Sequence, residues 1–188
     1  MNEFYINTSE LRKFCKNLNF GDKVYLSGVV YTSRDAAHKR IFELLHSSSP
    51  LPYELKDAVI YYAGPTHTPN GLAIGSCGPT TSSRMDSYSP ELYNLGVCAT
   101  IGKGPRSPEV CKAIIRNGGI YLCAIGGAGA LAAKSIKSCE VIAFEDLGCE
   151  SVKRLEFDNF PLIVGIDCNG GNIFVKQNKK TTGADNQT

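Results

Sequence analysis

The stretch that decides the fold class is DKVYLSGVVYTSRDAAHKRIFELLHSS, residues 22–48. Its first part, 22–32, is apolar and rich in β-branched side chains, a composition typical of a buried strand. Ser33 can cap a helix over 33–48, because the apolar residues of IFELL fall on one face of such a helix. A strand that runs directly into an amphipathic helix is characteristic of α/β domains.

The rest of the chain continues this alternation of strands and helices. The further predicted elements are a short helix within 1–20, strands at 57–64, 120–126 and 139–146, a helix and a strand within 89–102, helices at 107–119 and 127–136, and a hairpin-like pair around 169–171. Some strands lack an intervening helix, so we expect an α/β domain that is not purely doubly wound. A chain of 188 residues suits one domain, placed at 1–176, followed by a polar tail at 177–188 that we expect to be disordered.

The overall composition is that of a globular protein. Hydrophobic residues make up 43% of the chain, and the mean hydropathy is −0.12. A net charge of +2 without a basic run argues against a nucleic-acid binder. No stretch has the ~18 apolar residues of a membrane helix, and the first residues lack the apolar core of a secretion signal. We therefore expect a cytoplasmic protein.

The eight cysteines are spread along the chain, and no two lie closer than ten positions. Zinc and ferredoxin-type iron–sulfur sites usually contain at least one short cysteine pair, so the spacing predicts no metal site built by this chain. Without a secretion signal, a disulfide framework is not expected either. The thiols are interpreted as small apolar residues of the core.

The junction between the first strand and its helix carries a high density of charge. Arg34 is predicted at the first helical position with His38 one turn later on the same side, and Asp35 and Lys39 form a second i,i+4 pair. A helix N-terminus favours anions and disfavours cations, so Arg34 is placed to bind a carboxylate rather than to stabilise the helix. The competing interpretation is a solvated helix start with ordinary ion pairs.

Two later loops carry hydroxyl and cationic side chains. The first, GSCGPTTSSRMD at 75–86, is rich in Gly and Pro, and its backbone N–H groups can form a concave anion site. It contains two adjacent hydroxyls, Thr80 and Thr81, followed by Arg84. The second, TIGKGPR, places Lys103 between two glycines after a predicted strand. Taken singly, each loop also fits an ordinary capping turn with its cation in solvent.

A further pattern suggests a nucleotide site. The predicted strand at 120–126 is followed by GAGALAA, and the next strand ends at Asp146, nineteen residues after Gly127. This fits the Gly-x-Gly-x-x-Ala dinucleotide fingerprint with its acidic ribose ligand. The unit starts two-thirds of the way along the chain, which leaves little room for the rest of such a domain. We favour close packing, or a backbone loop that faces a substrate, over a dinucleotide-binding module.

Five motifs occur in one order between about residue 22 and about residue 174: YTSRDAAHKR, YYAGPT, GSCGPTTSSRMD, IGKG and AIGGAGALAAKSI. In this order they resemble the β subunit of two-subunit class I iron–sulfur fumarate hydratases and L-tartrate dehydratases, and the C-terminal domain of single-chain class I fumarases. The resemblance implies a swivelling β/β/α fold of three layers with mixed sheets. It also implies reversible hydration of fumarate to (S)-malate or, alternatively, dehydration of tartrate to oxaloacetate.

The same resemblance implies a cofactor and a partner. The cofactor would be a [4Fe-4S] cluster that is ligated by an α subunit rather than by this chain, in an α2β2 assembly. One iron would act as a Lewis acid on the substrate. The α subunit would also supply an Asp as general acid. A non-catalytic scaffold, whose cations dock an acidic partner, is the remaining alternative.

The resemblance also assigns roles to particular residues. Arg34, Arg84 and Lys103 would bind the substrate carboxylates. Thr80 would be the proton-abstracting hydroxyl, with Thr81 beside it in the anion-binding loop. Such a cluster of cations suits the reaction, because charge that develops on a carboxylate needs electrostatic stabilisation.

Three further residues are supporting candidates. Asp35 and His38 either orient Arg34 or are purely structural, and we favour the structural role. Gly127 would face the cavity through its backbone.

Overall fold

The computed structural model describes residues 1–124 and 129–175 of the chain. The strands are β1 (Glu3–Asn7), β2 (Lys23–Thr32), β3 (Val59–Tyr61), β4 (Ala99–Gly102), β5 (Ile120–Cys123), β6 (Ile136–Ala143) and β7 (Val152–Ile166). The α-helices are α1 (Leu11–Phe14), α2 (Asp35–His46), α3 (Ser89–Asn94), α4 (Pro108–Asn117) and α5 (Gly129–Lys134), and the 3-10 helices are η1 (Ser82–Met85) and η2 (Glu145–Glu150).

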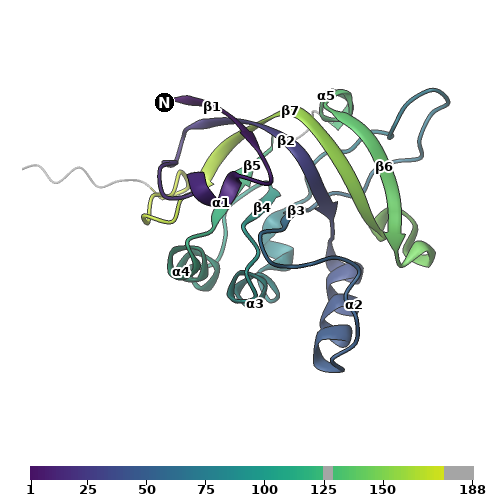
Figure 1. The fold of residues 1–188 in the computed structure, drawn as a ribbon, viewed down its shortest axis with the longest axis horizontal. Helices are drawn as coiled ribbons and strands as arrows, with labels where there is room; N and C mark the ends of the chain where they lie inside the picture. Colours follow the sequence, from purple (N-terminus) through teal and green to yellow (C-terminus); the bar gives the residue numbers. More distant parts are fainter. Residues whose placement is uncertain (125–128, 176–188) are drawn as a thin grey trace, which may run out of the picture.

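The strands form one mixed sheet that curls on itself. Neighbouring strands from β1 to β5 are parallel, whereas β7 runs antiparallel to β2, β5 and β6. Since β7 pairs with both β2 and β5, the strands β2, β3, β4, β5 and β7 close into a ring. Figure 1 shows β7 arching over the molecule beside β2. The α/β class with a mixed sheet is thus confirmed, and the sheet is partly barrel-like.

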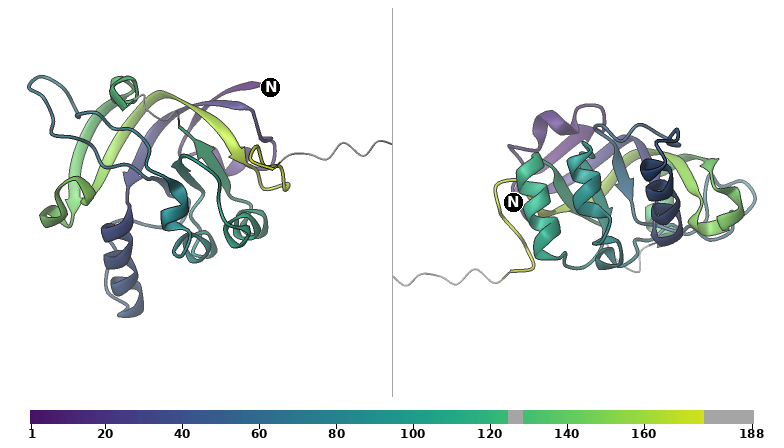
Figure 2. Two further views of the ribbon diagram at one scale, coloured as in Figure 1. Left: turned by 180° about the vertical axis from the view of Figure 1, so that it is seen from behind. Right: turned by 90° about the horizontal axis from the view of Figure 1, so that it is seen from below.

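Three helices, α2, α3 and α4, lie side by side on one side of the sheet (Figures 1 and 2). Strand β3 is buried on both of its faces, which is usual for a parallel strand between two layers. Tyr61 belongs to the core cluster enclosed by the curled sheet. Its neighbour Ile60 packs in a second cluster, with Ile41 of α2 and Leu92 of α3.

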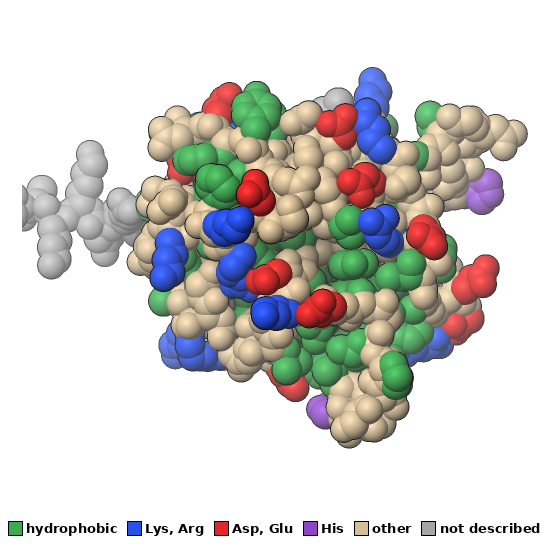
Figure 3. Space-filling model, in the orientation of Figure 1, with side chains coloured by type: hydrophobic (Ala, Val, Ile, Leu, Met, Phe, Trp, Pro, Cys, Tyr) green, Lys and Arg blue, Asp and Glu red, His purple; other side chains and the backbone are tan. Residues whose placement is uncertain are grey.

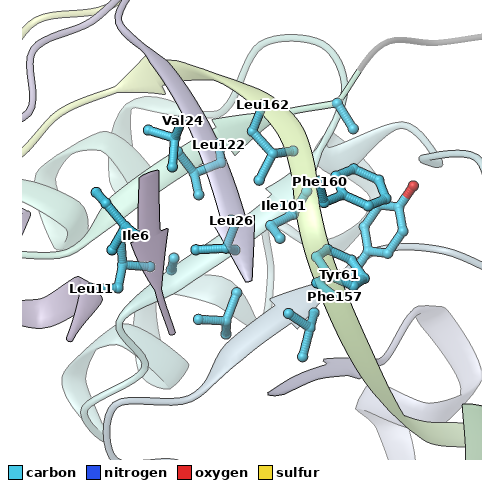
Figure 4. Close-up of a cluster of buried hydrophobic side chains, with 14 of the residues drawn as sticks. Ile6, Leu11, Val24, Leu26, Tyr61, Ile101, Leu122, Phe157, Phe160 and Leu162 are labelled. Carbon is cyan, nitrogen blue, oxygen red and sulfur yellow. The ribbon is translucent and has the colours of Figure 1, made fainter. Parts of the chain in front are cut away.

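The enclosed core contains the aromatic side chains that fill the space under β7. The rings of Phe157 and Phe160 stack with centroids 4.2 Å apart, and Tyr61 meets both edge-on. Leu26 and Leu122 point into the same space from β2 and β5 (Figure 4). Because β2 alternates between buried and half-buried residues, its inward apolar side chains, Val24, Leu26 and Val30, join this cluster.

The first stretch folds as predicted, with β2 followed by α2, but the region before it differs from the prediction. The segment EFYIN forms strand β1, which pairs in parallel with β2 and was not predicted. The short helix predicted within 1–20 is present as the four residues of α1. The hairpin expected around 169–171 is present as one antiparallel bridge, Ile166 to Asn172. The tail at 177–188 lies outside the described residues.

The surface mixes both signs of charge, as expected for a small net charge. On the face seen in Figure 3, basic and acidic side chains are interspersed around patches of hydrophobic ones. Among the described residues, no helix has the length and apolarity needed to cross a membrane.

Candidate functional site

The carboxyl ends of three parallel strands meet at one edge of the sheet. Arg34 follows β2, Gly64 follows β3 and Lys103 follows β4. Ligands of open α/β sheets bind characteristically at this edge, because the loops after the strands converge there. The sequence-predicted cations Arg34 and Lys103 therefore come from neighbouring loops, and this edge is the candidate site.

Backbone hydrogen bonds fix the threonine loop to this edge. The N–H of Thr80 donates to the carbonyl of Tyr62 at 2.7 Å, which continues the end of β3. The N–H of Lys103 donates to the carbonyl of Thr80 at 3.3 Å. The N–H of Ser82 in turn donates to the carbonyl of Lys103 at 2.9 Å, and Thr81 pairs with Lys103 as a β-bridge. The two threonines and the lysine thus lie side by side.

The side chains of this group are open to a ligand. Thr81 and Lys103 are exposed, and Thr80 is half-buried. A half-buried hydroxyl between two exposed polar groups is accessible to a small molecule while its backbone is held rigidly. This combination of a fixed loop and accessible polar groups is what a binding site needs.

Asp35 brings the two predicted arginines together. The Nε of Arg84 donates to Asp35 Oδ1 at 3.0 Å, and Nη2 of Arg84 lies 2.9 Å from Asp35 Oδ2. The Nε of Arg34 lies 3.7 Å from the same Oδ2. A fork-shaped contact of this kind sets the plane of the guanidinium group as well as its position. Arg34 and Arg84 therefore share one carboxylate, although their loops are far apart in the sequence.

Glu150 is a residue of the site that sequence reasoning missed. Its Oε1 lies 3.0 Å from Nη2 of Arg34, and its Oε2 accepts a hydrogen bond from the N–H of Ala36 at 3.0 Å. The side chains of Arg34 and Glu150 are both largely buried, with 18% and 22% exposed. The anion expected at the start of the helix is thus an internal carboxylate. No local spacing in the sequence signals it, because Glu150 arrives from η2 at the far end of β6.

The turn that carries Glu150 is held by a buried lysine. The ammonium of Lys153 on β7 contacts the carbonyl oxygens of Gly148, Cys149 and Ser151 at 3.0–3.3 Å, and the hydroxyl of Ser151 at 2.7 Å. Burial lowers the pKa of Lys153. These contacts satisfy the buried cation and fix the end of η2 from which Glu150 reaches the helix.

The predicted helix start is wrong by one position. The helix begins at Asp35, so Arg34 occupies the N-cap position rather than the first helical one, and its side chain makes no capping bond. The hydroxyl of Ser33, predicted as the cap, lies 2.9 Å from Nδ1 of His38 instead. Because His38 engages this hydroxyl, the free N–H of Ala36 is satisfied by Glu150.

His38 is buried beside the site and does not reach its open side. Its Nδ1 lies 3.2 Å from the carbonyl of Arg34, and its buried Nε2 has no hydrogen-bond partner among the described residues. Burial lowers the pKa of His38 to about 4, so the ring is neutral near pH 7. A neutral ring bound to the backbone of Arg34 fits the structural role favoured from the sequence.

Gly64 leaves the space that the guanidinium group of Arg34 occupies. A Cβ at position 64 would lie 2.5 Å from Nη1 of Arg34 and 3.3 Å from the carbonyl oxygen of Cys149. The motif YYAGPT therefore has a steric reason for its glycine, since only a residue without a side chain lets Arg34 lie against the end of β3.

The nucleotide pattern finds no support in the packing of its described residues. Gly127 lies outside the described part of the chain. Gly129 packs against the threonine loop, where its carbonyl accepts from the N–H of Cys77 and a Cβ would lie 3.0 Å from the backbone nitrogen of Gly78. Asp146 is exposed and forms a two-bond pair with Arg40 on α2. The close contact at Gly129 agrees with the packing interpretation.

The thiols do not gather as metal ligands in the described part of the chain. No group of three His, Cys, Asp or Glu side chains in residues 1–124 and 129–175 is arranged to hold a metal ion. Cys15 and Cys98 do approach within 3.6 Å in the core, but both are fully buried.

Comparisons with known proteins identify the family. The family described as "Fumarase C-terminus" matches residues 1–177. The chain is 42% identical over 175 residues to the putative L(+)-tartrate dehydratase subunit beta of Methanocaldococcus jannaschii, an alignment that covers 90% of each chain. It is 35% identical over 170 residues to the L(+)-tartrate dehydratase subunit beta of Escherichia coli, which covers 88% of this chain and 83% of that one.

Fumarate hydratases match over a similar part of this chain but a small part of their own. The chain is 43% identical over 159 residues to fumarate hydratase 2 of Leishmania major, which covers 83% of this chain and 28% of that protein. The chain thus spans less than a third of the length of that relative. By contrast, the family match and the alignments with the tartrate dehydratase subunits extend over nearly all of this chain. The chain therefore belongs to the fumarase C-terminus family.

Proposed function

We propose that this chain is the β-type part of an iron–sulfur hydro-lyase that hydrates fumarate reversibly to (S)-malate. The observation that carries the proposal is the carboxylate of Asp35 between the guanidinium groups of Arg34 and Arg84. A four-carbon dicarboxylate needs cations for both of its ends, and Lys103 joins the two arginines as a third cation at this edge of the sheet. The names of the relatives, fumarate hydratase and tartrate dehydratase, support the same class of reaction.

The charge balance of the site suits a dianion. Arg34 and Arg84 pair with two carboxylates, Asp35 and Glu150, and the exposed Lys103 adds one net positive charge to this group. The proton to be removed lies next to a carboxylate and is only weakly acidic. The charge that develops on that carboxylate must therefore be stabilised by the cations, and such electrostatic stabilisation is usually the largest catalytic contribution.

Thr80 is the residue we assign to proton transfer. In the direction from malate to fumarate, its oxygen accepts the proton from the carbon next to the bound carboxylate. The electron pair of that C–H bond becomes the second bond of the alkene, and the hydroxyl group leaves the neighbouring carbon with its own electron pair. A threonine oxygen is a weak base unless its deprotonated form is stabilised. The backbone N–H of Lys103 donates to the carbonyl of Thr80, and we assign that stabilisation to the ammonium group of Lys103. Thr81 adds a second hydroxyl to the same loop.

The iron–sulfur cluster is proposed to reside on a partner. The described residues offer no set of metal ligands, so the donor groups present here do not fit the cluster. An α-type subunit or domain would ligate it and supply the general acid, in an α2β2 assembly when the two parts are separate chains. The name "subunit beta" of the two tartrate dehydratase relatives supports such a partner. We also propose the swivelling β/β/α arrangement for a single domain over 1–176.

The test is an activity assay on the intact protein, prepared without oxygen together with its α-type partner. The assay follows the loss or gain of fumarate absorbance and, separately, the formation of oxaloacetate from tartrate. Arg84→Ala should lower kcat/KM for the favoured substrate by about tenfold or more, because a hydrogen bond to a charged group is lost. Arg116→Ala is the matched control, since Arg116 pairs with Asn94 near the amino end of β5, at the opposite edge of the sheet.

Each outcome decides between stated alternatives. Turnover of tartrate without turnover of fumarate would assign the L-tartrate dehydratase reaction. Turnover of neither substrate by the wild-type complex would refute the hydro-lyase. Wild-type kinetics in Arg84→Ala would show that Arg84 does not bind the substrate.

A further inference from the structure

A buried hydroxyl joins the two segments that carry the exposed cations of the site. Tyr121 on β5 is fully buried, and its hydroxyl lies 2.9 Å from Ser82 Oγ and 2.9 Å from the carbonyl oxygen of Gly104. Ser82 begins η1, which carries Arg84, and Gly104 directly follows Lys103. The side chain of Tyr121 in the core therefore contacts both the segment that carries Arg84 and the segment that carries Lys103.

The direction of both hydrogen bonds follows from the donors available. A carbonyl oxygen can only accept, so the hydroxyl of Tyr121 donates its one proton to Gly104. The hydroxyl of Ser82 must then donate to the oxygen of Tyr121. The chain of bonds runs from Ser82 through Tyr121 to Gly104, and no buried hydroxyl in it lacks a partner. Such a fully satisfied buried network favours one geometry.

A buried arginine anchors the opposite ends of the same two segments. Arg106, whose side chain is fully buried, donates from Nε to Asp86 Oδ1 at 2.7 Å. The other oxygen of Asp86 accepts from the N–H of Ser107 at 2.6 Å. The guanidinium group also lies over the ring of Tyr121, 5.0 Å from its centroid. Each segment is thus held at both ends, at Ser82 and Asp86 on one side and at Gly104 and Ser107 on the other.

The side chains of Arg84 and Lys103 are held by few contacts of their own. The side chain of Arg84 is 49% exposed and rests on Asp35, and Lys103 is exposed. Exposed ion pairs hold a side chain only weakly, with typical contributions of about 0–1 kcal/mol. The separation between the two cations is therefore set by the backbone of their segments, which is held by the bond from the N–H of Ser82 to the carbonyl of Lys103 and by the buried network.

We propose that Tyr121 is a positioning residue: its hydroxyl fixes the distance between the Arg84 and Lys103 segments, and so the fit to a short dicarboxylate. This inference rests on the proposed function and extends it to a residue that touches no substrate. A purely structural role is the alternative, because any buried tyrosine hydroxyl with two hydrogen bonds stabilises the fold.

Tyr93 offers a matched control for that alternative. It is equally buried, and its hydroxyl also has two partners, Thr100 Oγ1 at 2.8 Å and the carbonyl oxygen of Ile120 at 2.9 Å. These partners lie within β4 and β5 and not in the segments that carry Arg84 and Lys103. Tyr93→Phe should therefore lower stability by a similar amount without moving the cations.

The experiment compares Tyr121→Phe, Tyr93→Phe and wild type in the intact protein with its α-type partner. Both variants should lower the melting temperature. Tyr121→Phe alone should lower kcat/KM, roughly three- to tenfold, mainly through a higher KM. In a Lys103→Ala background the effect of Tyr121→Phe on kcat/KM should shrink to less than about half, because the residue through which it acts is gone.

Three results would separate the proposals. Equal kcat/KM in Tyr121→Phe and Tyr93→Phe, with an active wild type, would overturn the positioning role and leave the proposed function intact. An additive effect in the Lys103→Ala background would also overturn it. A wild type inactive on both fumarate and tartrate would refute the function on which it rests. Should Tyr121→Phe not fold, Ser82→Ala removes the bond between Tyr121 and the Arg84 segment and must also lower kcat/KM, while the bond from Tyr121 to Gly104 remains.

Discussion

Asp35 and Arg84, 49 positions apart in the sequence, are joined by two short contacts at the carboxyl edge of the sheet. The same carboxylate faces Arg34, which precedes it in the chain. Asp35 therefore does more than begin a helix, because it holds the guanidinium group of Arg84 close to Arg34.

Asp35→Ala should lower kcat/KM of the intact enzyme by roughly tenfold, since Arg84 loses the acceptor that orients it and Arg34 loses a neighbouring negative charge. The effects of Asp35→Ala and Arg84→Ala should be less than additive, because the two residues act as one unit. Steady-state kinetics of the two single variants and the double variant measure this coupling. Glu3→Ala is the control, because it breaks the exposed ion pair between Glu3 on β1 and Lys23 on β2. Full additivity would show that Asp35 does not orient Arg84.

Substitutions of Glu150 should distinguish its role as an acceptor at the start of the helix from its role as the ion-pair partner of Arg34. Glu150→Ala leaves the N–H of Ala36 without an acceptor and should lower the free energy of unfolding by about 1 kcal/mol. Glu150→Gln keeps an acceptor oxygen for this N–H, so its stability should stay near that of wild type. Both variants lose the charge that faces Arg34, and both should change KM. Chemical denaturation and kinetics of the same samples provide the check, and equal stability of the two variants would contradict the capping role.

Gly64→Ala should impair binding with little cost in stability. The added Cβ meets the flexible end of Arg34 at 2.5 Å, so the guanidinium group moves aside and the fold persists. We expect KM to rise several-fold and the melting temperature to fall by only a few degrees. A large drop in melting temperature with unchanged KM would instead mean that the added methyl group displaces the backbone and not the side chain of Arg34.

Burial of His38 makes stability depend on pH in a defined window. The pKa of the folded state is about 4, below the ordinary value of 6.5, so the unfolded state binds more protons between these values. The stabilising effect of the neutral ring is therefore complete above about pH 6.5 and is lost as the pH falls toward 4. The contribution is a few kcal/mol at most.

His38→Asn should flatten the pH dependence of unfolding in that window. Asparagine keeps a donor near the carbonyl of Arg34 and cannot titrate. Denaturant unfolding at several pH values between 4 and 7 measures the slope. His46→Asn, at the exposed end of the same helix, should leave the slope unchanged. An equally steep slope in His38→Asn would assign the pH dependence to other groups.

The local pattern predicts β2 and α2 well, because a β-branched apolar run and an amphipathic repeat each depend on neighbouring residues alone. At the N-terminus, the capping residues at 8–9 predict only the short helix that begins at Leu11. They do not predict strand β1, in which EFYIN lies along β2 and forms backbone hydrogen bonds with it. Pairing with a strand twenty positions later is a tertiary contact, and propensity does not contain it.

The features of the candidate site also fall into those that sequence patterns predict and those that depend on tertiary contacts. The sequence by itself predicted Arg34, Arg84 and Lys103 as carboxylate-binding residues and Thr80 as the proton-transfer residue, since all four stand in recognisable motifs. Only the tertiary structure decided that Asp35 links the two arginines, that Glu150 fills the helix start and that Tyr121 lies beneath both loops. The physical reason is that parallel strands bring their carboxyl ends to one edge, and buried hydrogen bonds then fix distances that have no counterpart in sequence spacing.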